Sequence, residues 1–287
     1  MQDENTFEPT SSRFHRPLPD SAGTDPFPPT HRGRYTIDEV TDFKLVRPCD
    51  IRGVLHAHSR YGDGAHTLED MVETARAIGL EYLGVSDHYL SAYHRDGLDI
   101  DAVARQREEI RDLNARFPDF DVMQGIELDT TVEGDLPLAE SDLLLFDYVI
   151  ASLPECRHCS EEEWTDRVLR IISQPLVSIL GKPVGEFMIR PGPVPMDMRT
   201  VLSAAAAAGT VVEVDANPHS SRLDWTNCQL AQELGAYLSI SPDAHRAARL
   251  VDFRHGAEMV REAGICCRSI VNTLTSSELR EFLRRKR

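Results

Sequence analysis

The amino-acid sequence predicts an α/β barrel built from about seven βα units and preceded by an irregular arm. From about residue 35 to the end, short apolar runs alternate with longer amphipathic segments, the pattern of strands and helices around a parallel sheet. The number of these pairs, about seven, favours a closed barrel over an open sheet.

The first 34 residues differ from the rest. They are rich in Pro, Ser, Thr and Asp and show neither helical nor strand periodicity, so residues 1–34 are expected to form a disordered or extended arm. Residues 35–287 contain no internal repeat and no clear second domain, so they are expected to form one barrel domain.

The individual elements follow from apolar runs and helix-start signals. Thr67 precedes the first amphipathic segment at the position of a helix N-cap. The expected strands are 53–57, 82–86, 121–126, 148–152, 176–180, 210–214 and 236–240. The expected helices are 67–78, 99–117, 161–172, 196–208, 226–234, 253–263 and 276–286.

Charge and composition narrow the functional classes. The formal net charge of −16 argues against a general DNA or RNA binder, although a basic or metal-lined cleft could override it locally. The amino end resembles no signal peptide, and no apolar run is long enough to span a membrane. We therefore expect a cytoplasmic protein with six reduced cysteines and no membrane partner; no feature identifies a protein partner.

Histidines and acids fall at the ends of the expected strands. In a parallel barrel the carboxyl ends of all strands open on one face, so these side chains should converge there. They come from four strand ends: His56, His58 and Asp63; His88; Glu127; and Asp243 with His245.

This mixture of imidazole and carboxylate suits Zn, Mn or Fe, whereas Mg and Ca prefer oxygen ligands alone. His56 and His58 are two residues apart, so on an extended strand both point to one side and can bind one ion. Glu127 has two oxygens and could bridge two ions.

Other acids and histidines of the sequence need not bind metal. Asp87 and Asp129 could orient ligand imidazoles or could be solvated loop acids. Four histidines outside the set are interpreted as ordinary polar residues: His66, His94, His158 and His255.

With these motifs, the sequence resembles the PHP (polymerase and histidinol phosphatase) family. The resemblance runs through His56-Ala57-His58, Asp63-Gly64, Ser86-Asp87-His88, Gly125-Ile126-Glu127-Leu128-Asp129 and Asp243-Ala244-His245. It is stronger still for the PHP domain of bacterial family X DNA polymerases, at Asp50-Ile51-Arg52-Gly53, Asp147-Tyr148-Val149-Ile150-Ala151-Ser152, Glu213-Val214-Asp215-Ala216-Asn217-Pro218 and Val271-Asn272-Thr273. The stretch before Asp50 is too short to contain a polymerase.

The resemblance implies a distorted seven-stranded barrel with up to three divalent ions, which hydrolyses phosphate esters with a metal-bound hydroxide. One implied ligand group is His56, His58, Glu127 and Asp243. A second implied group is Asp63, His88 and His245.

The third ligand group of the family is altered in this chain. Pro154 and Lys182 stand where the family has histidines after the fourth and fifth strands. Lys182 could place an ammonium where an ion once lay, or the Cys156-Arg157-His158-Cys159 loop could supply a replacement ligand. Alternatively, hydrolysis has been lost and the protein is a metal-stabilised scaffold.

We therefore expect a metal-dependent phosphoesterase that hydrolyses a mono- or diester of a small phosphorylated substrate. It would use two divalent ions, Mn or Zn, with Fe also compatible. Glu127, Asp243 and Lys182 would act in catalysis, and Arg190, Arg246 and Asn217 would bind the substrate. The alternatives are a non-catalytic PHP module with a binding role and a 3'-5' exonuclease acting on DNA.

Overall fold

The computed structural model describes residues 44–153, 159–183, 196–218 and 225–286. The expected arm at residues 1–34 lies outside these ranges, so its irregular structure stays a prediction.

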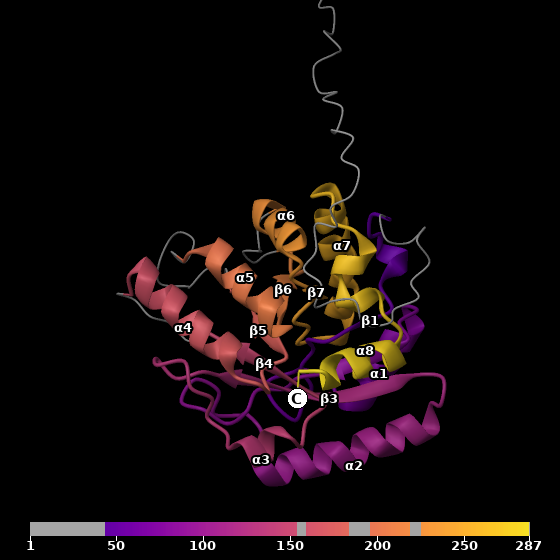
Figure 1. Ribbon diagram of the computed structural model, residues 1–287. Helices are drawn as coiled ribbons and strands as arrows, with labels where there is room; N and C mark the ends of the chain where they lie inside the picture. Colours follow the sequence, from indigo (N-terminus) through magenta and orange to yellow (C-terminus); the bar gives the residue numbers. More distant parts are fainter. Residues whose placement is uncertain (1–43, 154–158, 184–195, 219–224, 287) are drawn as a thin grey trace, which may run out of the picture. The chain divides into compact units, whose positions relative to one another are not determined.

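Seven parallel strands form one sheet in which each strand pairs with the next along the chain (Figure 1). The predicted seven-stranded barrel is thereby confirmed. The strands are β1 (Gly53–Val54), β2 (Tyr82–Val85), β3 (Asp121–Asp129), β4 (Tyr148–Ser152), β5 (Ile179–Gly181), β6 (Val211–Asp215) and β7 (Leu238–Ser241).

The first and last strands meet just beyond their ends, so the barrel is nearly closed. Ala57 forms an isolated parallel bridge with Ala244. The amide of His58 donates to the Ala244 carbonyl at 3.0 Å, and the Ala244 amide donates to the His56 carbonyl at 3.4 Å. This seam, residues 56–58 against Ala244, carries metal-ligand candidates on both sides.

Helices connect the strands, and most begin at a side-chain cap. Thr67, Ser160 and Thr275 each form a capping box with the acid three residues later, which satisfies free amides of the first turn. The helices are α1 (Leu68–Ala77), α2 (Ile100–Arg116), α3 (Glu140–Leu143), α4 (Glu161–Ser173), α5 (Met198–Ala208), α6 (Trp225–Leu234), α7 (Phe253–Glu262) and α8 (Ser276–Arg284). Short 3-10 helices occupy Pro48–Asp50, Ala247–Asp252, Cys267–Ser269 and Val271–Thr273.

Alternation along the strands divides the buried side chains into two layers. In β6, Val212 and Val214 pack outward in the large cluster between strands and helices, whereas Val211 belongs to the cluster inside the barrel. Other interior residues include Leu55, Tyr82, Met123, Tyr148, Ile150 and Ile179. The interior is thus apolar near the strand starts and leaves its polar side chains for the opposite end.

Helix α8 closes the apolar end of the barrel. Its Leu279 and Leu283 join the interior cluster. Arg280 donates to Asp121 at 2.7 Å and to Asp147 at 2.8 Å, at the starts of β3 and β4. The end of the chain therefore fixes the base of the barrel, opposite the candidate ligands.

Several expectations need correction. The first strand ends at Val54, so His56 and His58 follow it, and the third continues to Asp129, so Glu127 lies within it. The fifth begins at Ile179 because residues 174–176 form a bend and turn. Cys159 is disulfide-bonded, so the expectation of reduced cysteines is wrong for that residue. Cys49, Cys228, Cys266 and Cys267 are reduced, as expected.

Among the described helices, none has the length and apolar character needed to cross a membrane.

Candidate metal centre

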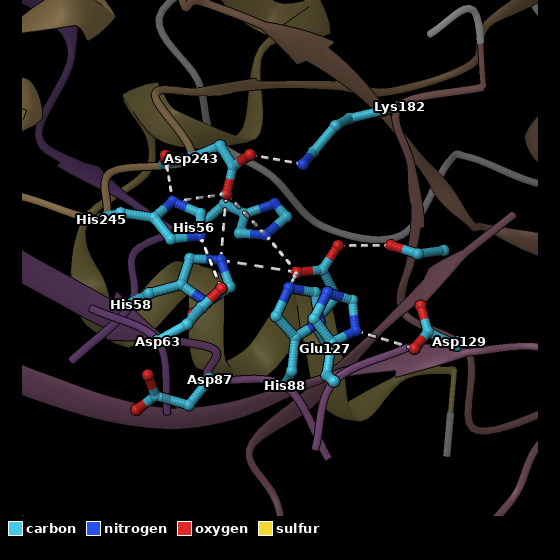
Figure 2. Close-up of polar contacts among 12 residues, drawn as sticks. His56, His58, Asp63, Asp87, His88, Glu127, Asp129, Lys182, Asp243 and His245 are labelled. Atoms are coloured by element: carbon cyan, nitrogen blue, oxygen red, sulfur yellow. Dashed lines mark hydrogen bonds and ion pairs between the residues drawn. The ribbon is translucent and has the colours of Figure 1, made fainter. Parts of the chain in front are cut away.

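The histidines and acids predicted from the strand ends converge at the polar end of the barrel (Figure 2). Their ligand atoms fall into two groups that share His58, with all atoms of each group within 4.8 Å of one another. The first group is His56, His58, Glu127 and Asp243; the second is His58, Asp63, His88 and His245.

The first group is almost completely buried. His56 Nε2 lies 2.9 Å from Glu127 Oε2 and 3.4 Å from Asp243 Oδ1. His58 Nε2 lies 2.9 Å from the same Asp243 oxygen and 3.4 Å from Glu127 Oε2. Two imidazole nitrogens and one oxygen from each acid therefore face a common point, which is the arrangement that one ion requires.

The second group is nearer the solvent. His245 Nε2 lies 3.2 Å from Asp63 Oδ2, and His58 Nδ1 lies 3.4 Å from Asp63 Oδ1. The rings of His58 and His245 stack with their centroids 4.1 Å apart. Since His58 belongs to both groups but one neutral imidazole serves one ion, its use in the first leaves Asp63, His88 and His245 for the second.

Without ions, the imidazoles and acids hold each other by charge. Burial alone would lower the pKa of His58, but Asp243 and Asp63 raise that pKa to about 9. Burial lowers the pKa of His88 to about 4, so this ring is neutral at pH 7. Burial opposes ionisation of Glu127 too, but His56 and Lys182 hold the pKa of Glu127 well below its usual value.

The second carboxylate oxygens of Glu127 and Asp243, the two acids of the first group, are bound by neighbouring side chains. Glu127 presents Oε2 to the imidazoles, while its Oε1 accepts a hydrogen bond from Ser152 Oγ. Asp243 presents Oδ1 to His58, while its Oδ2 is paired with the Lys182 ammonium. At the ends of β4 and β5, the Ser152 hydroxyl therefore lies beside Glu127 and the Lys182 ammonium lies beside Asp243.

The residues fit divalent ions. Nδ1 of His88 is buried and has no hydrogen-bond partner among the described residues, and the contact of His58 Nδ1 with Asp63 lacks hydrogen-bond geometry. Buried polar atoms without partners are uncommon in folded proteins. Together with the mixed imidazole and carboxylate donors, they match the ligand chemistry of Zn, Mn or Fe.

His94 was interpreted as an ordinary polar residue, but it lies at the centre. Its Nδ1 is 2.9 Å from Asp129 Oδ2, and its ring stacks on His88 with centroids 3.3 Å apart and planes 8° apart. His88, His94 and Asp129 bring ligand atoms within 4.8 Å. Because the two rings are parallel, one ion cannot lie in both ring planes, so the stack would have to open before both could bind it.

Asp87 supports the loop that carries Asp63, and no hydrogen bond or ion pair joins its carboxylate to an imidazole within the described part of the chain. Its carboxylate accepts hydrogen bonds from the Ser59 amide, the Ser59 hydroxyl and Gln106 Nε2, each at 2.6 Å. Asp129 does orient an imidazole, one of the two roles expected for it. That imidazole belongs to His94, which is not one of the predicted ligands.

Glu213 belongs to a stretch that carries the family resemblance, but the sequence pattern assigns it no role. It lies within β6 with a fully buried side chain, and both of its carboxylate oxygens are 2.9 Å from His56 Nδ1. An acid inside an apolar strand run was the available signal, because such a charge is costly unless it is paired.

The remaining predicted residues are less central or lie outside the described ranges. Arg246 is exposed on the loop after His245. Asn217 accepts a hydrogen bond from Arg249 at 3.1 Å, beyond the end of β6. The residues outside the described ranges are Pro154, Cys156, Arg157, His158 and Arg190.

Comparisons with known proteins agree with the fold and with the motifs. Residues 55–189 match the family model for the PHP domain. The DNA polymerase/3'-5' exonuclease PolX of Bacillus subtilis (strain 168) is 28% identical over 242 residues, which cover 84% of this chain and 42% of that protein. A probable phosphatase of Thermoanaerobacter sp. (strain X514) is 26% identical over 249 residues, 82% of this chain and 96% of that protein.

A solved structure supports the architecture. Histidinol phosphate phosphatase (HISK) from Lactococcus lactis subsp. lactis Il1403, in complex with zinc, L-histidinol and phosphate, superposes with a TM-score of 0.56 at 17% identity. The match covers 75% of this chain and 94% of that chain. Residues 55–189 thus match the PHP family, and the seven-stranded parallel barrel agrees with that match.

Proposed function

We propose that this protein is a metal-dependent phosphoesterase that uses two divalent ions, Zn or Mn, to hydrolyse a phosphate ester of a small molecule. The observation that carries the proposal is the pair of overlapping imidazole and carboxylate groups at the carboxyl ends of the strands. Bound divalent ions would supply Lewis acidity and a nucleophilic hydroxide at neutral pH.

The protein's own residues have distinct parts in this proposal. His56, His58, Glu127 and Asp243 would hold one ion, and Asp63, His88 and His245 the other. Glu127 and Asp243 fix the ligand geometry, because each has one oxygen in the site and one held from outside. Lys182 would use its ammonium to stabilise negative charge on the phosphoryl group.

Charge favours two ions over three. Asp63, Glu127, Asp129, Glu213 and Asp243 carry five negative charges when ionised, and Lys182 carries one positive charge. Two divalent ions would leave the site about neutral, whereas a third would leave about two positive charges in a largely buried site. Lys182 thus takes over part of the neutralisation that a third ion would provide.

The relatives support a phosphate ester as the substrate. The Thermoanaerobacter protein is named a probable phosphatase, and the Lactococcus protein is a histidinol phosphate phosphatase. Both matches cover most of those chains, whereas the match to PolX covers 42% of its length. The net charge of −16 also opposes binding to a DNA backbone, so an exonuclease activity is the weaker proposal.

A substrate panel tests the activity. Protein reloaded with Zn or Mn is expected to cleave at least one phosphate mono- or diester, and His56→Ala should reduce that rate to background. No cleavage by wild-type protein that binds two ions per chain would refute catalysis and support a non-catalytic metal-binding module. The pairing of Lys182 with Asp243 gives that second reading its structural basis, because an ammonium already contacts a proposed ligand.

A further inference from the structure

We propose that Glu213 is a positioning residue of the metal centre, whose buried carboxylate fixes the ring of His56 so that Nε2 faces the first ligand group. The inference depends on the proposed function in one respect, namely that His56 is a metal ligand.

The strand places Glu213 directly beneath the centre. Val211, two residues earlier on the same face of β6, packs in the apolar interior of the barrel. The next inward side chain is Glu213, which has no exposed side-chain surface. A charge at this depth is unfavourable without a partner, so its position requires a specific contact.

That contact is His56. Both oxygens of Glu213 are 2.9 Å from His56 Nδ1, and no other hydrogen bond to this carboxylate is recorded among the described residues. In the proposed arrangement Glu213 accepts this hydrogen bond as a carboxylate, and Nδ1 carries the hydrogen. In the neutral ring, Nε2 is then the nitrogen with a free lone pair.

The opposite nitrogen faces the first group. His56 Nε2 lies 2.9 Å from Glu127 Oε2 and 3.4 Å from Asp243 Oδ1. One ring therefore joins the buried Glu213 on one edge to the site on the other. A carboxylate bonded to the far nitrogen fixes the tautomer and makes the ligand nitrogen more basic, and loss of such a partner typically weakens metal binding about 10–100-fold.

A purely structural role makes a different prediction. If Glu213 only stabilised the barrel through a buried pair, its replacement would lower the stability of the metal-free protein and leave ion affinity unchanged. A positioning role instead weakens one ion selectively, because His56 contributes to the first group but not to the second.

The experiment compares Glu213→Gln and Glu213→Leu with wild type by titrating the metal-free protein with zinc against a chromophoric chelator. The Gln carbonyl can still accept from Nδ1, so Glu213→Gln should weaken one ion about 10-fold, whereas Glu213→Leu should weaken it about 100-fold. The other ion should keep its affinity within about threefold in both variants. Nitrogen NMR of the zinc-loaded wild type should show His56 with hydrogen on Nδ1 and zinc on Nε2.

Asp121→Asn is the matched control, since it removes an acid paired with Arg280 at the opposite end of the barrel. It should lower stability without changing zinc affinity. Wild-type zinc affinity in both Glu213 variants, equal weakening of both ions, or no zinc binding by wild type would overturn the proposal. The zinc titration does not depend on hydrolysis. A protein that binds zinc but fails the substrate panel would therefore refute the proposed function and leave the role of Glu213 intact.

Discussion

Lys182 and Asp243 form an ion pair, and both have backbone conformations in the left-handed region, with φ of 39° and 47°. Among the described residues, these are the two non-glycine residues with positive φ. This conformation costs a non-glycine residue on the order of 1–2 kcal/mol, and such costs concentrate at functional sites. The barrel therefore holds two strained residues in contact at the edge of its candidate metal centre.

The strain and the ammonium of Lys182 can be separated by two substitutions. Lys182→Ala and Lys182→Gly both remove the ammonium, but only glycine adopts positive φ without cost. We expect the glycine variant to be more stable than the alanine variant by about 1 kcal/mol in urea unfolding. Both should lower kcat about 100-fold if the ammonium stabilises the phosphoryl charge. Equal stability of the two variants would argue against backbone strain at this position.

Metal uptake should release protons. In the metal-free protein the pKa of His58 is about 9, and Glu213, Glu127 and Asp243 raise the pKa of His56 well above its usual value despite burial. Both rings are therefore protonated at pH 7 and must lose about two protons in total to bind metal, whereas His88, with a pKa of about 4, loses none.

Affinity for zinc should consequently rise with pH and level off only above about pH 9, as protons cease to compete for His58. Calorimetric titration in buffers with different ionisation enthalpies measures the number of protons released. A zinc affinity that is constant between pH 6 and 8 would contradict this prediction.

Gly125 allows Tyr148 to cross the interior of the barrel. A Cβ at Gly125 would lie 2.3 Å from the Tyr148 ring, and the Tyr148 hydroxyl donates to the Leu55 carbonyl at 2.5 Å. Gly125→Ala should therefore destabilise the protein by about 1–3 kcal/mol through overpacking. Gly79→Ala is not a suitable control, because its φ of 91° adds strain of its own.

Ser203→Ala is a better comparison for Gly125→Ala, since Ser203 lies on the exposed face of α5. Its effect on thermal unfolding should remain within about 0.5 kcal/mol. If Gly125→Ala were equally mild, the interior would have more free space than the Tyr148 contact indicates.

Acid should weaken the segment before β1 through Asp50. Burial would raise the pKa of Asp50, but Arg47 and Lys44 lower it to about 2, below its usual 3.8. A lowered pKa stabilises the fold above about pH 4, and this contribution is lost as the pH falls toward 2.

Asp50→Asn should therefore cost about 1–2 kcal/mol at neutral pH, and its difference from wild type should shrink below pH 4. Urea unfolding at several pH values measures both effects. Asp119→Asn removes a carboxylate from an exposed pair with Arg76 and should have little effect. A difference between wild type and Asp50→Asn that did not change with pH would exclude the ion pairs as its source.

The fold was accessible from the sequence because alternating apolar runs and amphipathic segments record burial directly. The arrangement of ligand candidates was accessible for the same reason, since Glu127 and Asp243 follow such runs and parallel strands end on one face. Strand limits were less accurate: β5 starts at Ile179 because the turn before it contains the apolar Leu176, which periodicity cannot distinguish from a strand residue.

Contacts between distant residues could not be read from spacing. His94 is six residues after His88, and only the folding of the intervening loop onto Asp129 stacks their rings. Glu213 and His56 are 157 positions apart, and nothing in either local pattern records their contact. The resemblance supplied Lys182 as a departure from a family position, but its strained backbone and its bond to Asp243 emerge only in three dimensions.

The seam between the first and last strands should couple the release of a bound ion to local opening of the barrel. Ala57 pairs with Ala244 at this seam. His56 and His58 flank Ala57, and Asp243 precedes Ala244, so an ion bound by these three side chains would join the two chain segments. The two segments would then separate only when that ion is released. The rate at which excess chelator removes the ion should therefore equal the hydrogen-exchange rate of the His58 and Ala244 amides.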